Sequence, residues 1–310
     1  MKQADLSIII PVYNEEKNIP PLYAQLHNVL YTLPHAIEII FVDDGSRDNT
    51  TTLIQSLTLH DKKIKLIQLR KHFGKATALS AGFRQAQGAI IITIDGDLQD
   101  DPCEIPRFVD KIHQGYDLVS GWKYHRKDPL NKTIPSKIFN NIARVITGIN
   151  IHDFNCGFKA YKKEVAKTLN LYGEMHRYIP AIAHRNGFRI GEIKVIHHPR
   201  KYGKSKYGIL RVLKGFIDLL TVAYLSTYME RPLHLFGMVG GIIFSFGFAA
   251  GLYLTYLWWI DITIWNRPLP IFAALLMIVG IQFLFTGFIG EMIVNFTRNN
   301  NKEIENKIKR

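Results

Sequence analysis

Apolar and polar residues alternate in blocks along the first two thirds of the chain. Short runs rich in Ile, Val and Leu, each bounded by turn-forming residues, occur at residues 6–12, 37–42, 64–69, 89–94 and 118–120. Between the runs, apolar residues recur at helical spacing, at residues 19–33, 49–59, 75–87 and 105–114. Continuous apolar strands that alternate with helices predict an α/β fold with a mostly parallel sheet flanked by helices.

The pattern changes after residue 206. In residues 207–231, charged and apolar residues recur at helical spacing and would lie on opposite faces of a helix. This pattern predicts a juxtamembrane amphipathic helical segment. Such a helix could pack on the domain core, but its position just before two long apolar stretches favours the membrane interface. Residues 233–260 and 269–290 contain no Asp, Glu, Lys or Arg, and about 20 apolar residues cross a bilayer. We therefore predict a hairpin of two transmembrane helices, at about 233–260 and 269–295, within a membrane segment at residues 232–297.

Charge around these stretches predicts their orientation. Lys and Arg gather before the first stretch and in a basic tail at residues 298–310, whereas the connecting loop has Arg267 balanced by Asp261. Both termini and a domain at residues 1–206 are therefore expected on the cytoplasmic face. The apolar run before Asn14 is too short for a signal peptide and predicts a strand. Cys103 and Cys156 form neither a metal cluster nor a disulfide framework, which favours a reducing compartment.

The formal net charge of +13 indicates an anionic partner: nucleic acid, a lipid surface or a phosphorylated substrate. The cationic residues flank the apolar stretches and two loops instead of forming one stripe with stacking aromatics, so we expect no nucleic-acid partner. No G-x-G-x-x-G follows the first strand and no Walker A sequence is present, which disfavours a nicotinamide dehydrogenase and a P-loop enzyme.

An acidic segment, IITIDGDLQDDP at residues 91–102, follows a predicted strand. Four carboxylates within seven residues repel one another, and a bound Mg²⁺ or Mn²⁺ would relieve that repulsion. Alternate residues of a strand point to opposite faces, so Asp95 and Asp97 can share a metal only if the backbone turns between them, which Gly96 permits. The alternative is an acidic turn after a buried strand.

Two other polar segments also follow predicted strands, at residues 13–16 and 43–46. Ligands on mostly parallel sheets bind beyond the carboxyl ends of the strands, so this convergence favours a ligand site. Asp43 and Asp44 could accept hydrogen bonds from a nucleobase or ribose. The same segment could instead form a helix N-cap region, since Ser46 and Asp48 precede a helical stretch. Both interpretations can hold together.

Four segments in this order, SIIIPVYNEE, FVDDGSRDNT, KHFGKATALSAGF and TIDGDLQDDP, resemble the family 2 glycosyltransferases with a GT-A fold. Within that family the chain is similar to the polyprenyl-phosphate glycosyltransferases, relatives of dolichol-phosphate mannose synthase and bactoprenol glucosyltransferases. The resemblance covers essentially the whole chain, including both apolar stretches. It implies metal-dependent transfer of a sugar from a nucleotide sugar to the phosphate of a polyprenyl phosphate at the cytoplasmic face of the membrane.

The resemblance also assigns roles to particular residues. By it, Pro11, Tyr13 and Glu15 would line the nucleotide pocket, Asp44 would contact the base, and Asp95 would lie by the donor phosphates. Asp97 and Gln99, with Asp95 beside them, would hold the Mg²⁺ or Mn²⁺. Asp95, Asp97 and Asp153 are the candidate catalytic residues.

Asp153, in HDFNCGFKAY, matches a family position near the reaction centre, where a base, an acceptor positioner and a sugar ligand are all open roles. It could instead cap a turn before Asn155 and Gly157. Asn155 stands where the family more often has Arg, so any role of that Arg is in doubt unless Lys159 substitutes for it.

Two basic segments are candidates for binding phosphate. The first corresponds to a family segment that contacts the acceptor phosphate. The second, with Gly203 allowing close approach, is expected to form a lid over the donor; a basic loop attracted to anionic lipid is the alternative. The candidate residues are Arg126, Lys132, Ser136 and Lys137 in the first segment, and Arg200, Ser205 and Lys206 in the second.

The donor and the oligomeric state are open at this point. A UDP- or GDP-hexose, with glucose or mannose as the sugar, and an undecaprenyl or dolichyl acceptor fit the same residues. Glycines of the apolar stretches could pack helices within one chain or in a homo-oligomer. A processive polysaccharide synthase is disfavoured because no Trp follows Arg, as its Gln-x-x-Arg-Trp motif requires. A membrane-tethered scaffold without activity is the remaining alternative.

Overall fold

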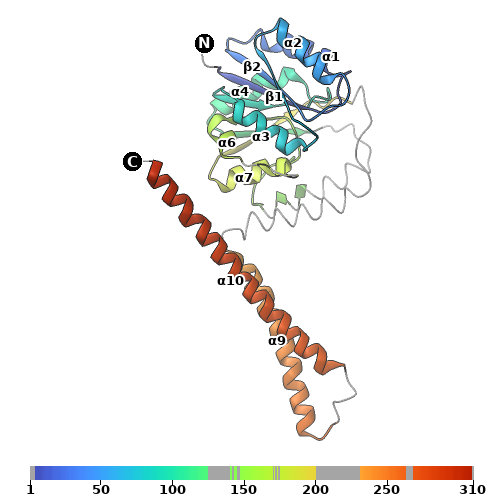
Figure 1. Cartoon of the computed structure of the whole chain (residues 1–310), viewed down its shortest axis with the longest axis vertical. Helices are drawn as coiled ribbons and strands as arrows, with labels where there is room; N and C mark the ends of the chain where they lie inside the picture. The colour runs from blue at the N-terminus through green and yellow to red at the C-terminus, as the bar shows by residue number, and fades with distance from the viewer. Residues whose placement is uncertain are drawn as a thin grey trace. The chain divides into compact units, whose positions relative to one another are not determined.

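The computed structural model describes residues 4–124, 140–199 (apart from 142, 145, 146, 170, 172 and 174), 231–262 and 268–308. Contacts within the chain divide it into two compact units, Met1–Val222 and Ala223–Arg310. Figure 1 labels several of their helices and strands.

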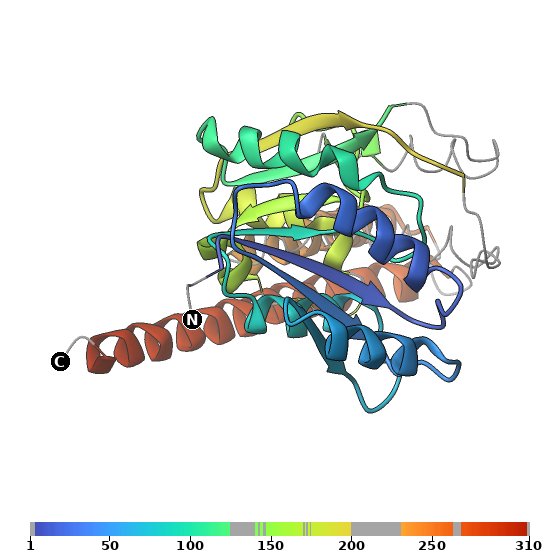
Figure 2. The same cartoon turned by 90° about the horizontal axis from the view of Figure 1, so that it is seen from above.

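A seven-stranded mixed sheet forms the centre of the first unit. Its strands are β1 (Leu6–Val12), β2 (Ile37–Asp43), β3 (Ile64–Gln68), β4 (Ile90–Thr93), β5 (Leu118–Lys123), β6 (Lys159–Lys162) and β7 (Ile190–Val195). The strand order is β3-β2-β1-β4-β6-β5-β7, and its twist can be followed in Figure 2. Neighbouring strands are parallel except where β6 pairs with β4 and with β5. The carboxyl ends of β1, β2 and β4 therefore meet at one edge.

Helices cover both faces of this sheet. One apolar core packs the sheet against α1 (Ile19–Leu30), α2 (Thr50–His60) and α4 (Ile105–His113). A second core packs the opposite face against α3 (Lys75–Gln85), α6 (Lys163–Thr168) and α7 (Ile179–Arg185). Alternate residues of β1 divide between the cores, with Ile8 and Ile10 in the first and Ile9 in the second. Strands buried on both faces explain the unbroken apolar runs of the sequence. Two 3₁₀ turns, η1 (Pro102–Glu104) and η2 (Met175–Tyr178), complete this part.

The predicted α/β class and mostly parallel sheet are confirmed, and the predicted strands and helices match observed ones to within a few residues. The sequence pattern did not predict β6 and β7. Their sequences, KAYK and IGEIKV, are short and partly polar, without the continuous apolar run typical of a central strand.

The second unit contains two apolar helices, α9 (Pro232–Trp259) and α10 (Leu269–Ile308). The segments Pro232–Trp259 and Leu269–Phe296 are long and apolar enough to cross a membrane, as predicted. Glycines let the two helices approach closely, since a Cβ on Gly240 would lie 2.6 Å from the Gly280 carbonyl oxygen.

The helix α10 is longer than the predicted span. The predicted second span, to about residue 295, agrees with the apolar segment that ends at Phe296, and the helix continues beyond it through the basic tail to Ile308. Residues 291–308 contain no Gly or Pro that would end it. The amphipathic helix predicted at residues 207–231 lies outside the described residues, apart from Arg231.

Candidate active site

Polar side chains of three adjacent parallel strands converge at the carboxyl edge of the sheet. Tyr13 follows β1, Asp44 follows β2, and the acidic segment at residues 95–101 follows β4. Register pairs β1 with both β2 and β4, so these segments are neighbours in space. A doubly covered sheet binds its ligands at such an edge.

Asp44 holds the loop that precedes α3. Its carboxylate accepts hydrogen bonds from the backbone N–H groups of Phe73 and Gly74, each 2.8 Å long, and contacts His72 Nδ1 at 2.7 Å. The His72 ring stacks on Tyr13, with ring centroids 4.1 Å apart. Two predicted nucleotide-site residues, Tyr13 and Asp44, are thus linked through a histidine that the sequence analysis did not identify.

The turn after β2 is held by its first aspartate. Asp43 accepts hydrogen bonds from the Ser46 backbone N–H, at 2.9 Å, and from the Thr51 hydroxyl. Gly45 adopts φ +74, and a Cβ there would lie 2.5 Å from the Lys71 backbone, so only glycine fits. Asp48 accepts hydrogen bonds from the backbone N–H and hydroxyl of Thr50 at the start of α2. The segment therefore forms a strand-end turn that leads into α2, whose N-cap residue Asn49 makes no capping hydrogen bond through its side chain.

The turn after β1 docks on that segment. Pro11 lies in β1, opposite Val42 of β2. The Glu15 backbone N–H donates to the Thr50 hydroxyl at 2.8 Å, and the Glu15 carboxylate accepts a hydrogen bond from Asn18. The proposed nucleotide contacts of Pro11 and Glu15 stay predictions.

Asp95 lies among cationic side chains. Its carboxylate and Lys75 Nζ are 2.5 Å apart. Burial raises the pKa of Asp95, but Lys75 and Lys123 outweigh this and lower the pKa to about 2. Gly157 packs on the same carboxylate, where a Cβ would lie 2.6 Å from Oδ1. Asp95 is therefore an ionised group held in place from two sides.

Asp97 begins a tight turn. It is buried, and its carboxylate accepts a hydrogen bond of 3.2 Å from the Gln99 backbone N–H. The residue with positive φ is Leu98, at 63°, and not Gly96, to which the sequence analysis attributed the turn. Gly96 is needed for space, since a Cβ there would lie 2.8 Å from Val12 Cγ1. The turn holds the Gln99 backbone at the Asp97 carboxylate, whereas the Gln99 side-chain amide donates to the His198 carbonyl at 3.5 Å. The metal-binding roles of both residues stay predictions.

The last two acids of the segment have structural partners. Asp100 is buried, and its carboxylate forms an ion pair with Lys123 of β5 at 3.0 Å. Its backbone forms an isolated antiparallel β-bridge with His197. Burial lowers the pKa of Lys123, but Asp100 and Asp95 more than offset this and raise it well above its ordinary value. Asp101 contacts His198 at 3.2 Å. These contacts tie the acidic segment to β5 and to the chain after β7.

Asp153 is 1% exposed, and its carboxylate accepts a hydrogen bond of 3.1 Å from the Asn155 backbone N–H. The predicted turn-capping contact is therefore present, and the catalytic role of Asp153 stays a prediction. Lys159 is 2% exposed and donates to the Cys156 carbonyl. Burial lowers the pKa of Lys159. Lys159 thus fixes the backbone beside Gly157.

The residues at the end of β4 suit a divalent cation that a ligand helps to hold. No group of three His, Cys, Asp or Glu in the described part of the chain could hold a metal by itself. Mg²⁺ is commonly bound through one or two carboxylates together with substrate phosphates. Asp97, with Gln99 and Asp95 close by, offers such a partial set of oxygen donors.

Several partners of the site were missed in the sequence because they come from distant segments. Lys75 lies 20 residues from Asp95, and Lys123 lies 23 residues from Asp100. One signal was available for Lys75, which directly follows Gly74 at the start of a predicted helix inside a recognised motif. The predicted phosphate-binding residues lie outside the described residues: Arg126, Lys132, Ser136, Lys137, Arg200, Ser205 and Lys206.

Comparison with known proteins identifies the family. The sequence pattern of Glycosyl transferase family 2 matches residues 7–169. The chain is 37% identical over 304 residues to the dodecaprenyl-phosphate galacturonate synthase of Rhizobium johnstonii, covering 94% of this chain and 88% of that protein. It is 36% identical over 293 residues to the undecaprenyl-phosphate 4-deoxy-4-formamido-L-arabinose transferase of Shewanella sediminis, covering 93% and 86%.

A solved structure supports the fold. Glucosyl-3-phosphoglycerate synthase of Mycobacterium tuberculosis, crystallised with Mn²⁺, UDP and glucosyl-3-phosphoglycerate, aligns with a TM-score of 0.55 at 16% identity, covering 72% of this chain and 80% of that one. At this identity the likeness concerns the GT-A architecture. The predicted family is confirmed: the chain is a glycosyltransferase of family 2 and belongs with the polyprenyl-phosphate glycosyltransferases.

Proposed function

We propose that the protein transfers a sugar from a nucleotide sugar to the phosphate of a polyprenyl phosphate. The observation that carries the proposal is the meeting of Asp44, Asp95 and Asp97 at one edge of the sheet, in a chain with two helices able to cross a membrane. The two relatives, named for polyprenyl-phosphate sugar transfer, match nearly the whole chain and not only the catalytic domain.

The nucleotide occupies the carboxyl ends of β1 and β2 in this proposal. Tyr13 and His72 present stacked rings beside Asp44, and a base has a flat face to stack on such rings. Asp44 orders the backbone of residues 73 and 74, so the start of α3 is fixed before a ligand binds. That helix begins with Lys75, whose ammonium group would balance charge on the donor diphosphate in this proposal.

Asp97 and Gln99 would hold the divalent cation, with Asp95 beside them. When bound, Mg²⁺ or Mn²⁺ neutralises charge that develops on the departing nucleoside diphosphate. Lys75 and Lys123 keep Asp95 ionised and add positive charge to the same region. Gly157 and Lys75 hold the Asp95 carboxylate in a single position.

The acceptor phosphate needs little activation. A phosphate monoester has a second pKa near 6, so it is mostly dianionic at neutral pH and is already a nucleophile. Asp153, held by its turn, then serves to position the acceptor or the sugar instead of removing a proton. Arg126, Lys132, Ser136 and Lys137 are the proposed contacts of the acceptor phosphate, and residues 200–207 the proposed lid over the donor.

The proposal also covers the donor sugar and the orientation of the protein in the membrane. A hexose on UDP or GDP is the expectation from the sequence, whereas the two relatives are named for galacturonate and 4-deoxy-4-formamido-L-arabinose. We therefore include uronic-acid and modified pentose donors beside the hexoses. The charge distribution favours a catalytic domain and both termini on the cytoplasmic face, with the product used later at the opposite face.

The experiment uses the full-length protein in detergent, undecaprenyl phosphate and a panel of nucleotide sugars, with lipid products identified by mass spectrometry in Mg²⁺, Mn²⁺ or EDTA. We expect one metal-dependent glycolipid, and a loss of about 100-fold or more in Asp97→Asn. Asp110→Asn, an exposed residue of α4, is the matched control. Absence of product from every donor, together with absence of nucleotide binding, would falsify the proposal.

A further inference from the structure

A histidine outside the predicted site lies beside it. His176 belongs to the short turn η2, which packs against α3 and α7. It lies within electrostatic reach of Lys75 and Asp95, the pair at the end of β4, and of Lys159. The chain thus brings an imidazole from a separate segment to the region where the donor diphosphate is proposed to bind.

One nitrogen of this ring has no partner among the residues that the structure describes. The Nδ1 atom is buried and makes no hydrogen bond with any residue that the structure describes. Buried polar atoms of native proteins are nearly always paired, because an unpaired one loses its hydrogen bond to water without replacement. An unpaired atom beside a site is therefore a position where a ligand atom is expected.

The charge state of the ring limits what that ligand atom is. Burial lowers the pKa of His176 well below its ordinary value, and Lys75, Arg177 and Lys159 lower it further. A neutral imidazole has one donor and one acceptor nitrogen. It offers no charge to a diphosphate, whose charge the lysines are suited to balance. It is well suited to a hydroxyl or amide group, which both donates and accepts.

We propose that His176 is a specificity-determining residue that hydrogen bonds a hydroxyl or amide substituent of the transferred sugar through Nδ1. The inference rests on the proposed function, because it assumes a sugar attached to the diphosphate next to Asp95. The acceptor phosphate is another source of oxygen atoms near this position, so the experiment separates donor from acceptor.

The test compares His176→Leu, which removes the hydrogen-bonding atom, with His176→Asn, whose amide lies near the Nδ1 position. Dissociation constants are measured for UDP, UDP-glucose, UDP-galacturonate, GDP and GDP-mannose without acceptor. The readout is the ratio between each nucleoside diphosphate and its sugar derivative. We expect His176→Leu to reduce this ratio, and so the gain in affinity that the sugar provides, about tenfold for at least one pair. His176→Asn should restore most of that gain. UDP and GDP should bind as they do to the wild type.

His184→Leu is the matched control, since His184 is an exposed histidine of the neighbouring helix α7. The same ratios in wild type, His176→Leu and His176→Asn would overturn the inference. So would a change confined to the KM for undecaprenyl phosphate, which would assign His176 to the acceptor. Failure of the proposed function would look different, because no glycolipid would form even with the wild type.

Discussion

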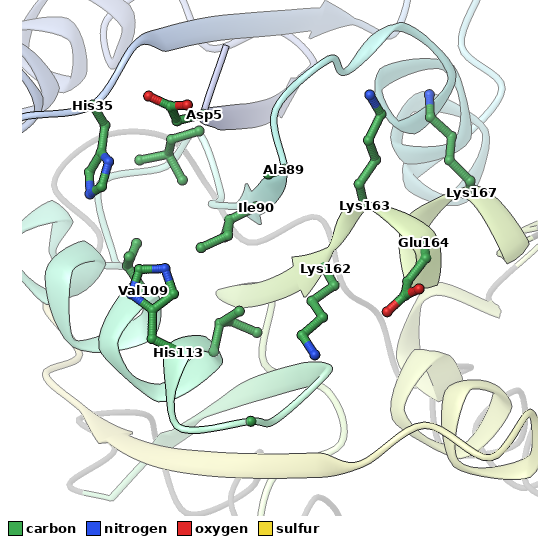
Figure 3. A pocket seen from close by; sticks show the side chains of 13 residues that line it. Asp5, His35, Ala89, Ile90, Val109, His113, Lys162, Lys163, Glu164 and Lys167 are labelled. Atoms are coloured by element: carbon green, nitrogen blue, oxygen red, sulfur yellow. The ribbon is translucent and has the colours of Figure 1, made fainter. Parts of the chain in front are cut away.

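The two edges of the sheet differ in how their charged residues are used. At the carboxyl edge, Asp44 and Asp95 lie among His72, Lys75 and Lys123, next to the segments that follow β1, β2 and β4. At the amino-terminal edge, the starts of β1 and β4 line a pocket of about 940 Å³ (Figure 3). This pocket is also rich in charged side chains, and by volume alone it would attract attention as a binding site.

The lysines of that pocket serve the fold. Lys167 donates hydrogen bonds to the carbonyls of Phe83 and Arg84 near the end of α3, and Lys163 donates to Gln87. In Figure 3 their side chains extend away from Ile90, in keeping with these contacts. Lysine at the end of a helix satisfies its last carbonyls. A hollow rich in cations is therefore a weaker indication of catalysis than an aspartate held ionised by lysines at a strand end, as Asp95 is.

The largest effect is expected from Gly157→Ala at the carboxyl edge. The added Cβ would displace the Asp95 carboxylate, since it would lie 2.6 Å from Oδ1. A misplacement of this kind lowers the rate by about 100-fold. Sugar transfer and thermal stability are measured together, with Gly251→Ala, where a Cβ has open space, as the control. Full activity in Gly157→Ala would show that the position of Asp95 does not matter.

Lys75→Met is expected to have an intermediate effect, a loss of about tenfold in donor binding. The substitution should also change how the stability of the fold depends on pH in acid. The pKa of Asp95, about 2, lies below its ordinary value of 3.8, so the ion pair stabilises the fold above pH 4, and this contribution is lost as the pH falls towards 2. Because Lys123 still acts on Asp95 in the variant, the loss should be about 1 kcal/mol at neutral pH and less in acid. Unfolding followed across this pH range checks the sign; an equal loss at every pH would contradict it.

The smallest effect is expected from Lys167→Met at the amino-terminal edge. Loss of its hydrogen bonds to the end of α3 should cost about 1 kcal/mol, or a Tm lower by about 2–4 °C. Sugar transfer should stay within about twofold of the wild type, because the site is at the other edge. A severe loss of activity without loss of stability would break the comparison and give the pocket a functional role.

The sequence predicted what depends on local pattern. Strands such as Leu6–Val12 were recognisable because burial on both faces leaves an unbroken apolar run, and α9 because its segment lacks charge. The strand β6 was not recognisable, because KAYK could equally form a loop. Its place between β4 and β5 depends on contacts between segments that are distant in sequence.

The candidate site divides in the same way. Asp44, Asp95 and Asp97 were proposed from the sequence because each follows a predicted strand within a recognisable motif. His72, Lys75 and His176 were missed as site residues, because their relation to those acids arises only when α3 and η2 fold onto the sheet. A linear pattern shows which residues follow a strand, but it does not show which side chains meet them across the fold.

The reversed direction of β6 has a consequence for how such enzymes change over evolution. Because β5 and β6 are antiparallel neighbours, the connection of residues 124–158 leaves the sheet and returns to it at the same edge, the one that carries Asp95. Away from Asp153 and Gly157, its length and sequence can vary while both strands keep their register. The connection is therefore a replaceable segment, through which a new acceptor or sugar can be accommodated without rebuilding the nucleotide site on β1, β2 and β4.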